Sequence, residues 1–177
     1  MAFMTTLNHT IHRTIQTIVA RGGEAYQVMA DQVIIKIPGE ATNGAYTVVE
    51  VISPPGGGPP ALHTHQPQET FYILEGVATF ETLHGGELVK IEAKPGDIVH
   101  IPGMTPHTYR NYGSQPLHFI TLISPAGMDR FFAELGVHIT DPANPPRPSG
   151  PPDMARVLRI AAKHGIEFVG PRPDAAP

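Results

Sequence analysis

The chain has 177 residues with 20 Pro and 18 Gly, and this density of helix-breaking residues excludes an architecture of long helices. The formal net charge is -4 and no stretch is rich in Lys or Arg, so we expect no nucleic acid partner. The chain has no Cys, which excludes disulfides and thiolate metal sites, so a bound metal must be held by nitrogen and oxygen ligands.

The N-terminal segment, residues 1–23, has no single structural pattern. Ile11, Ile15 and Ile18 have helical spacing, whereas the many Thr residues favour a strand. The first residues are too polar for a secretory signal, and no apolar run approaches the ~18 residues that cross a membrane. We therefore leave this segment unassigned and expect a cytoplasmic protein without a membrane partner.

Residues 24–124 form a series of short runs rich in β-branched and aromatic residues, each closed by Gly, Pro or Asn. The runs are QVIIKI, AYTVVEVI, ETFYIL, VATFETL, ELVKIEA, DIVHI, HTYRN and LHFITLI. This pattern is typical of an all-β sandwich or barrel, with Pro and Gly in the turns. The length of the chain favours one domain, so we predict a single β-barrel for this region.

Residues 125–177 are expected to pack on the barrel. The apolar spacing of MDRFFAEL predicts a short helix that ends at Gly136. The linker 141–152 is too rich in Pro for a helix or a central strand. A second helix follows, with Asp153 as its N-cap and Gly165 at its C-terminal end. Its predicted buried residues are Met154, Val157, Leu158 and Ala161.

The most informative stretch is GGGPPALHTHQPQETFYILEG. On a strand, His63 and His65 project from the same face and can bind one ion. If a strand resumes after the QPQ bend, Glu69 adds a carboxylate beside the two imidazoles. A second stretch, GDIVHIPGMTPHTYRN, supplies His107, with Tyr109 on the same strand face. Three imidazoles and one carboxylate suit Fe, Ni, Co, Mn, Cu or Zn better than Mg or Ca, so we predict one divalent transition metal.

These residues resemble the two sequence motifs of the cupin superfamily. The first motif is matched by Gly57, His63, His65, Glu69 and Gly76, and the second by Gly96, Pro102, His107 and Asn111. One departure lies in the turn before the last histidine, where Gly103 stands one place early and Met104 occupies the position usual for Gly. The departure alters the turn more than the position of the histidine.

Further features are similar to the single-domain, quercetin 2,3-dioxygenase-like cupins of bacteria, namely PPGGGPP, ETFYILEG, GDIVHIP, SPAGMDRFFAELG and HGIEFVGP. This resemblance implies an antiparallel jelly-roll barrel, usually a homodimer, with the metal inside. It implies that His63, His65, Glu69 and His107 are the metal ligands and that Glu69 is also the catalytic base. The implied activity is a metal-dependent dioxygenase that uses O2 to cleave a flavonol or a related enolisable or phenolic aromatic.

The chemistry expected of the site depends on an apolar lining. A carboxylate in such a lining has a raised pKa, which would let Glu69 accept a proton near neutral pH. The candidate substrate-pocket residues are Phe71, Ile73, Tyr109, Phe119, Met128, Phe131 and Phe132. His100 and His118 lie in predicted strands and are either partners of the metal ligands or ordinary barrel residues. Two other functions stay open: a metal-dependent isomerase or lyase, and a non-catalytic module that binds a small molecule.

Overall fold

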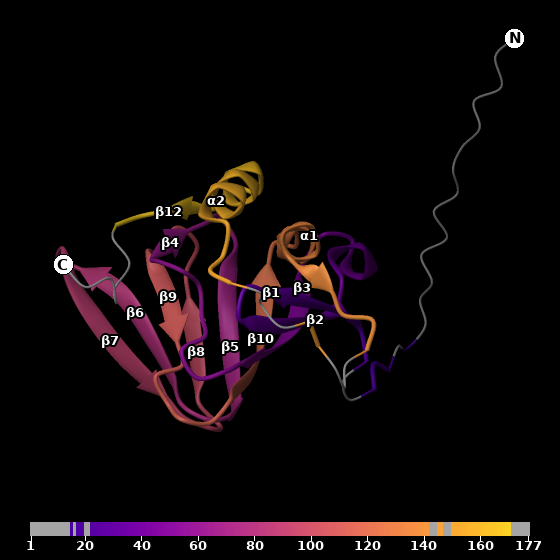
Figure 1. Ribbon diagram of the computed structural model, residues 1–177, viewed down its shortest axis with the longest axis horizontal. Coiled ribbons are helices and arrows are strands. Elements are labelled where there is room, and N and C mark those ends of the chain that lie inside the picture. Colours follow the sequence, from indigo (N-terminus) through magenta and orange to yellow (C-terminus); the bar gives the residue numbers. More distant parts are fainter. Residues whose placement is uncertain (1–14, 16, 20–21, 142–144, 147–149, 171–177) are drawn as a thin grey trace, which may run out of the picture.

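The structure is a computed structural model that describes residues 15, 17–19, 22–141, 145–146 and 150–170. In this part of the chain, two antiparallel β-sheets face each other and two α-helices lie together at one end of them (Figure 1). The predicted all-β jelly-roll barrel with two accompanying helices is therefore confirmed. The unassigned N-terminal segment lies mostly outside the described residues.

The larger sheet has the strand order β11-β1-β2-β3-β10-β5-β8. Its strands are β1 (Glu24–Val28), β2 (Asp31–Ile37), β3 (Thr47–Ser53), β5 (Gln68–Glu75), β8 (Ile98–Ile101), β10 (Leu117–Ser124) and β11 (Val137–His138). A 3-10 turn, Gly39–Thr42, joins the second and third of these strands. Each neighbouring pair is antiparallel, so chain segments far apart in sequence lie side by side.

The smaller sheet has the strand order β12-β4-β9-β6-β7. Its strands are β4 (His63–Thr64), β6 (Ala78–His84), β7 (Glu87–Ala93), β9 (His107–Arg110) and β12 (Glu167–Phe168). All eight predicted runs are strands, whereas β1, β4, β11 and β12 were not predicted. Three of the missed strands have only two residues each, and they form because distant partners pair with them, which no local pattern reveals.

The core lies between the two sheets and follows the two-residue period of the strands. On β5, Phe71 and Ile73 are buried, whereas Tyr72 between them is exposed. Phe119 on β10 pairs with Ile73 across the ladder and is also buried. Glu69 follows the same alternation as Phe71, so the sequence pattern itself directs its carboxylate into the barrel.

The first helix, α1 (Met128–Leu135), lies over one end of the barrel. Its Met128, Phe131 and Leu135 are buried, as the apolar spacing predicts, and the helix ends at Gly136. The glycine is required there because a Cβ would lie 2.7 Å from the Cβ of Tyr26. α1 therefore presents one apolar face to the interior of the barrel.

The second helix, α2 (Met154–Lys163), begins and ends as predicted. The Asp153 side chain accepts from the Arg156 backbone N–H at 3.1 Å, the bond expected of an N-cap. At the other end Gly165 has a φ of 71°, and the Ile166 N–H donates to the Ala161 carbonyl at 2.9 Å. This is a Schellman motif, whose left-handed residue favours glycine.

The predicted buried face of α2 is wrong in part. Val157 and Ala161 are buried, but Met154 and Leu158 are 38% and 48% exposed, and Ile160 is buried instead. The physical reason lies at Arg156, whose guanidinium donates to the last two carbonyls of α1 at 2.8 and 2.9 Å. These two bonds set the rotation of α2 about its axis and turn the other apolar residues toward solvent.

The Pro-rich linker between the two helices agrees with its prediction. The described part of the Pro-rich linker contains neither helix nor strand. Within the described ranges, no helix combines the length and the apolar character that crossing a membrane requires.

Candidate metal centre

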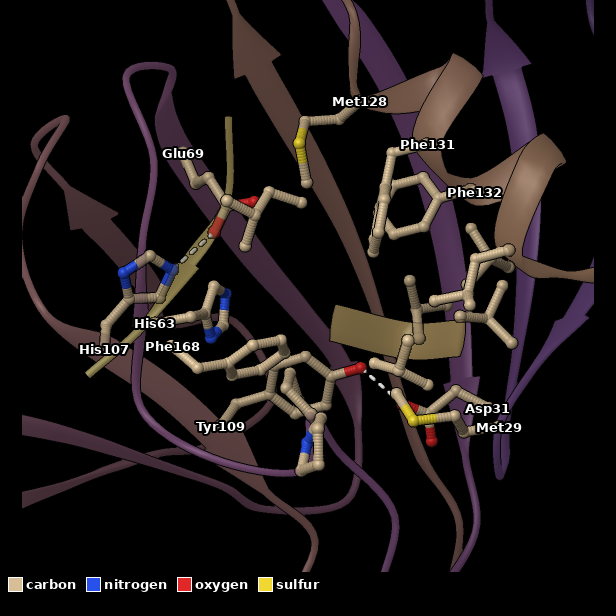
Figure 2. Close-up of a pocket in the computed structure, with 18 of the residues that line it drawn as sticks. Met29, Asp31, His63, Glu69, His107, Tyr109, Met128, Phe131, Phe132 and Phe168 are labelled. Carbon is tan, nitrogen blue, oxygen red and sulfur yellow. Dashed lines mark hydrogen bonds and ion pairs between the residues drawn. The ribbon is translucent and has the colours of Figure 1, made fainter. Parts of the chain in front are cut away.

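An apolar cavity of about 90 Å³ lies inside the barrel, and residues of both helices form part of its wall. Figure 2 shows side chains that line it. Six of the seven predicted pocket residues line it, namely Phe71, Tyr109, Phe119, Met128, Phe131 and Phe132. Ile73 does not line it and lies fully buried two residues further along β5. His63, Glu69 and His107 form one end of the cavity wall.

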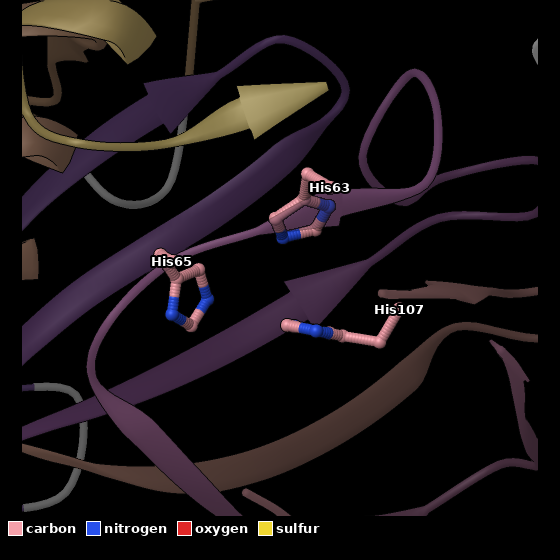
Figure 3. Close-up of side chains that lie close together, drawn as sticks. All are labelled: His63, His65 and His107. Atoms are coloured by element: carbon pink, nitrogen blue, oxygen red, sulfur yellow. The ribbon is translucent and has the colours of Figure 1, made fainter. Parts of the chain in front are cut away.

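Three histidines lie side by side at that end. His63 is on β4 and pairs directly with His107, the first residue of β9, and His65 follows β4. One ring nitrogen from each residue lies within 4.8 Å of the others, and the three rings surround a common space (Figure 3). The strand pairing therefore creates a group of imidazoles that can bind one metal ion.

A nearby backbone carbonyl orients each of these rings. Nδ1 of each histidine donates to a carbonyl oxygen two residues away in the chain, which leaves Nε2 to face the common space. The acceptors are the carbonyl oxygens of Ala61 at 3.2 Å, Pro67 at 2.8 Å and Thr105 at 2.7 Å. This is the arrangement in which metal-binding histidines are usually held.

Glu69 approaches the group from the opposite sheet. Its Oε2 lies 3.1 Å from His107 Nε2, and its Oε1 lies 3.8 Å from His65 Nε2. His65 Nε2 is buried and has no hydrogen-bond partner among the described residues. A buried imidazole nitrogen without a partner is costly unless it has a ligand to bind, so the donor set fits a transition metal.

The protonation of the group differs from the sequence expectation. Burial would raise the pKa of Glu69, but the hydrogen bond and the charge of His107, with smaller contributions from His65 and His63, outweigh it, so the pKa is lowered. The expected raised pKa of Glu69 is therefore wrong, because the histidines that surround the carboxylate favour its ionised form.

The pKa values of the three histidines also shift in different directions. Burial, together with the charge of His107, lowers the pKa of His63 to about 3. Burial also lowers the pKa of His65. At His107 burial acts in the same direction, but the Glu69 carboxylate outweighs it and the pKa is raised. His63 and His65 are thus neutral at neutral pH and are ready to act as ligands.

The departure in the second motif has a structural explanation. Met104 adopts the left-handed conformation, with a φ of 63°, at the position where Gly is usual, and its N–H donates to the His65 carbonyl at 2.8 Å. A Cβ on Gly103 would lie 2.2 Å from the Gln66 carbonyl oxygen. The turn before His107 is therefore packed against the segment that carries His65.

The other motif residues hold the barrel together and do not face the metal group. A Cβ on Gly57 would lie 2.2 Å from Ser53 Oγ, and the Gly57 carbonyl accepts from the Asn111 N–H at 3.2 Å. The Asn111 side chain donates to the Ser53 carbonyl at 2.9 Å. Gly76 has a φ of 78° in the turn between β5 and β6.

The other two strand histidines have partners elsewhere. His100 is exposed on β8 and its Nδ1 lies 3.0 Å from Thr70 Oγ1. His118 on β10 contacts Glu50 at 2.8 Å. Neither lines the cavity.

Several lining residues were not predicted. Asp31, at the start of β2, and Phe168, on β12, both face the cavity. β12 reaches the site because Phe168 pairs with His63, and the next residue, Val169, donates its N–H to the Leu62 carbonyl at 2.8 Å. The only signal for Asp31 was a lone acidic residue before an apolar run, and the last strand has no period long enough to read.

Comparison with known proteins agrees with this geometry. The model of the cupin domain family matches residues 49–123, the range that contains the whole candidate metal group. The chain contains a cupin domain. Over 115 residues it is 31% identical to quercetin 2,3-dioxygenase of Bacillus subtilis, a match that covers 65% of this chain and 31% of that enzyme. The chain thus spans less than a third of the length of that relative.

Solved structures support the fold. A predicted oxalate decarboxylase of Thermotoga maritima has a TM-score of 0.52 at 23% identity, and the match covers 62% of this chain and 99% of that one. A polyketide cyclase of Streptomyces resistomycificus has a TM-score of 0.53 at 20% identity, and the match covers 62% of this chain and 80% of that one. These proteins bear different names, so the shared fold does not identify a reaction.

Proposed function

We propose that this cupin is a metal-dependent dioxygenase that cleaves a carbon-carbon bond of a small enolisable or phenolic compound. The observation that carries the proposal is a group of oriented imidazoles, His63, His65 and His107, at the end of an apolar cavity. The partial similarity to quercetin 2,3-dioxygenase supports the choice of reaction. In this proposal the three histidines and Glu69 hold one divalent transition metal.

The residues of the chain would contribute in three ways. When bound, the metal supplies Lewis acidity and reactivity toward O2. Glu69 is ionised at neutral pH and would accept the proton of an enol or phenol at a carboxylate oxygen. Phe71, Phe119 and Met128 exclude water from the space beside the group.

The size of the cavity favours a small substrate. An apolar cavity of about 150 Å³ holds one benzene ring, and ligand pockets commonly have about 300 to 1,000 Å³. The space here is about 90 Å³, less than one benzene ring needs, so even a one-ring compound requires the lining side chains to shift outward slightly. A three-ring flavonol would enter only if the C-terminal segment over the cavity shifted.

The test is oxygen uptake by protein loaded separately with Fe, Ni, Co, Mn, Cu and Zn. We expect uptake with a dihydroxyacetophenone or a β-diketone, and slower uptake with a flavonol. His65→Ala should lower metal affinity by more than about 100-fold, because it removes a ligand and not merely a supporting contact. The control His100→Ala removes an exposed histidine outside the cavity and should leave affinity and uptake unchanged.

Other results would point to the two alternatives. Turnover of the same compounds without oxygen would indicate an isomerase or lyase in place of a dioxygenase. Metal and ligand binding without turnover of any compound in the panel would indicate a binding module.

A further inference from the structure

The cavity contains a second polar group besides the candidate metal group, which consists of His63, His65, His107 and Glu69. Among its lining residues, the polar and charged side chains are His63, Glu69, His107, Asp31 and Tyr109, and all others are apolar. Tyr109 lies two residues after His107 on β9, and Asp31 begins β2 on the opposite sheet. Figure 2 shows the Tyr109 hydroxyl pointing to Asp31 and away from the metal group. The cavity thus has one polar group at each end.

The hydrogen bonds of this pair decide what it can bind. The Tyr109 hydroxyl donates to Asp31 Oδ2 at 2.6 Å, and Ser53 Oγ donates to Asp31 Oδ1 at 2.6 Å. Both carboxylate oxygens are therefore engaged, and the single proton of the tyrosine hydroxyl is used. What remains on the Tyr109 oxygen is the capacity to accept a hydrogen bond.

The packing around the pair keeps it in place. Asp31 is 5% exposed, and its bond to Ser53 joins the start of β2 to the end of β3. The Tyr109 ring stands edge-on to Phe119, with ring centroids 5.0 Å apart at 80°. A hydroxyl held by a buried carboxylate and a packed ring is a preorganised acceptor at a defined position.

We propose that the Tyr109–Asp31 pair selects ligands that carry a hydrogen-bond donor, a hydroxyl or an N–H, at the end remote from the metal group. The ligand would then have a metal-binding oxygen at one end and the donor at the other, with apolar atoms between them. This inference rests on the proposed function for the metal-binding end of the ligand. Tyr109 is a specificity residue in this view, and Asp31 is the residue that orients it.

The test measures binding without turnover. The protein is loaded with zinc, which has no redox chemistry, and is titrated by calorimetry with 2-hydroxyacetophenone and with its 2,4- and 2,5-dihydroxy analogues. We expect one dihydroxy analogue to bind about 3- to 10-fold more tightly than the parent compound, the gain typical of one hydrogen bond. In Tyr109→Phe this preference should disappear, while the affinity for the parent compound stays within about twofold because the ring is retained.

A matched control and a second variant complete the experiment. Tyr112→Phe removes a tyrosine hydroxyl that donates to Glu81 outside the cavity and should keep the full preference. Asp31→Asn places an amide beside Tyr109; with the amide oxygen toward Ser53, its NH2 donates to the tyrosine, whose hydroxyl is then free to donate. This variant should shift the preference toward a methoxy analogue, which accepts a hydrogen bond. It also provides the test of the pair if Tyr109→Phe does not fold.

The outcomes separate this inference from the proposed function. If wild type shows no preference for either dihydroxy analogue, or if Tyr109→Phe keeps the preference, the inference is wrong whether or not oxygen is consumed. If the preference is present and depends on Tyr109 but no metal form consumes oxygen, the inference stands and the dioxygenase proposal fails. If no compound of the series binds, the inference is wrong as well.

Discussion

At the scale of single residues, Gly103 shows how closely the two histidine-bearing segments approach. Any side chain there would collide with the carbonyl of Gln66, which lies between His65 and the Pro67 carbonyl that accepts from its ring. The neighbouring Met104 takes the left-handed conformation and donates to the His65 carbonyl. The orientation of His65 therefore depends on a turn that is nearly forty positions away in the sequence.

Gly103→Ala should lower the free energy of unfolding by about 1 to 3 kcal/mol, the usual cost of overpacking. It should also weaken metal binding by about 10-fold or more, because the segment that orients His65 must move. In the control Gly150→Ala, the added methyl group meets no atom of the described residues within 4 Å apart from its chain neighbours. Urea denaturation and metal titration of both variants measure these effects. Equal metal affinities of Gly103→Ala and Gly150→Ala would contradict the prediction.

At the scale of elements, a charged group joins three adjacent strands of the larger sheet. Glu50 on β3 lies 3.0 Å from Lys36 Nζ on β2 and 2.8 Å from His118 Nε2 on β10. Burial would raise the pKa of Glu50, but Lys36 and His118 outweigh it and the pKa is lowered from its ordinary value of 4.5. The folded protein therefore binds a proton at Glu50 less readily than the unfolded chain does.

A pH dependence of stability follows from this lowered pKa. The contribution of Glu50 is fully present above the unfolded pKa of 4.5 and is lost as the pH falls through the lower pKa of the folded state. Wild type should thus lose more stability than Glu50→Gln as the pH falls below about 5. Urea denaturation at a series of pH values checks this, with Glu87→Gln on the exposed strand β7 as the control. Parallel curves for wild type and Glu50→Gln would contradict the prediction.

At the scale of the whole molecule, the C-terminal segment completes the site. α2 packs against α1, and β12 pairs with β4 directly beside the metal group, so Val157, Ile166 and Phe168 form part of the cavity wall. Figure 1 shows α2 and β12 at the same end of the barrel as β4. The size of the cavity therefore depends in part on residues that follow the barrel in sequence.

Removing one of these side chains should change the size of the preferred ligand. Phe168 lines the cavity with its ring centroid 6.0 Å from that of His63, so Phe168→Ala should enlarge the space. We expect tighter binding of a flavonol relative to 2-hydroxyacetophenone, and a loss of stability of about 1 to 3 kcal/mol, below the full cost for a completely buried Phe. Calorimetric titration of the zinc-loaded protein gives the affinity ratio. Leu158→Ala, on the exposed side of α2, is the control and should leave the ratio unchanged.

Much of the fold and of the metal group could be predicted because both depend on short-range patterns. Alternating apolar residues identified the strands, and the spacing of His63, His65 and Glu69 identified the candidate ligands. The pKa of Glu69 was predicted in the wrong direction, since its three imidazole neighbours come from other elements of the fold. The buried face of α2 was also wrong in part, since its rotation depends on Arg156 binding to α1.

By itself, the sequence determined the class of the fold, the strand runs, the two helices and the residues able to bind a metal. These features depend on local periodicity and on the chemistry of single side chains, which a sequence displays directly. Only the tertiary structure decided which side chains meet across the barrel. The pairing of β12 with β4, the contact of Tyr109 with Asp31 and the small volume of the cavity all arise from segments far apart in the chain. Such contacts depend on how the sheets and helices pack against each other, and no local pattern records that packing.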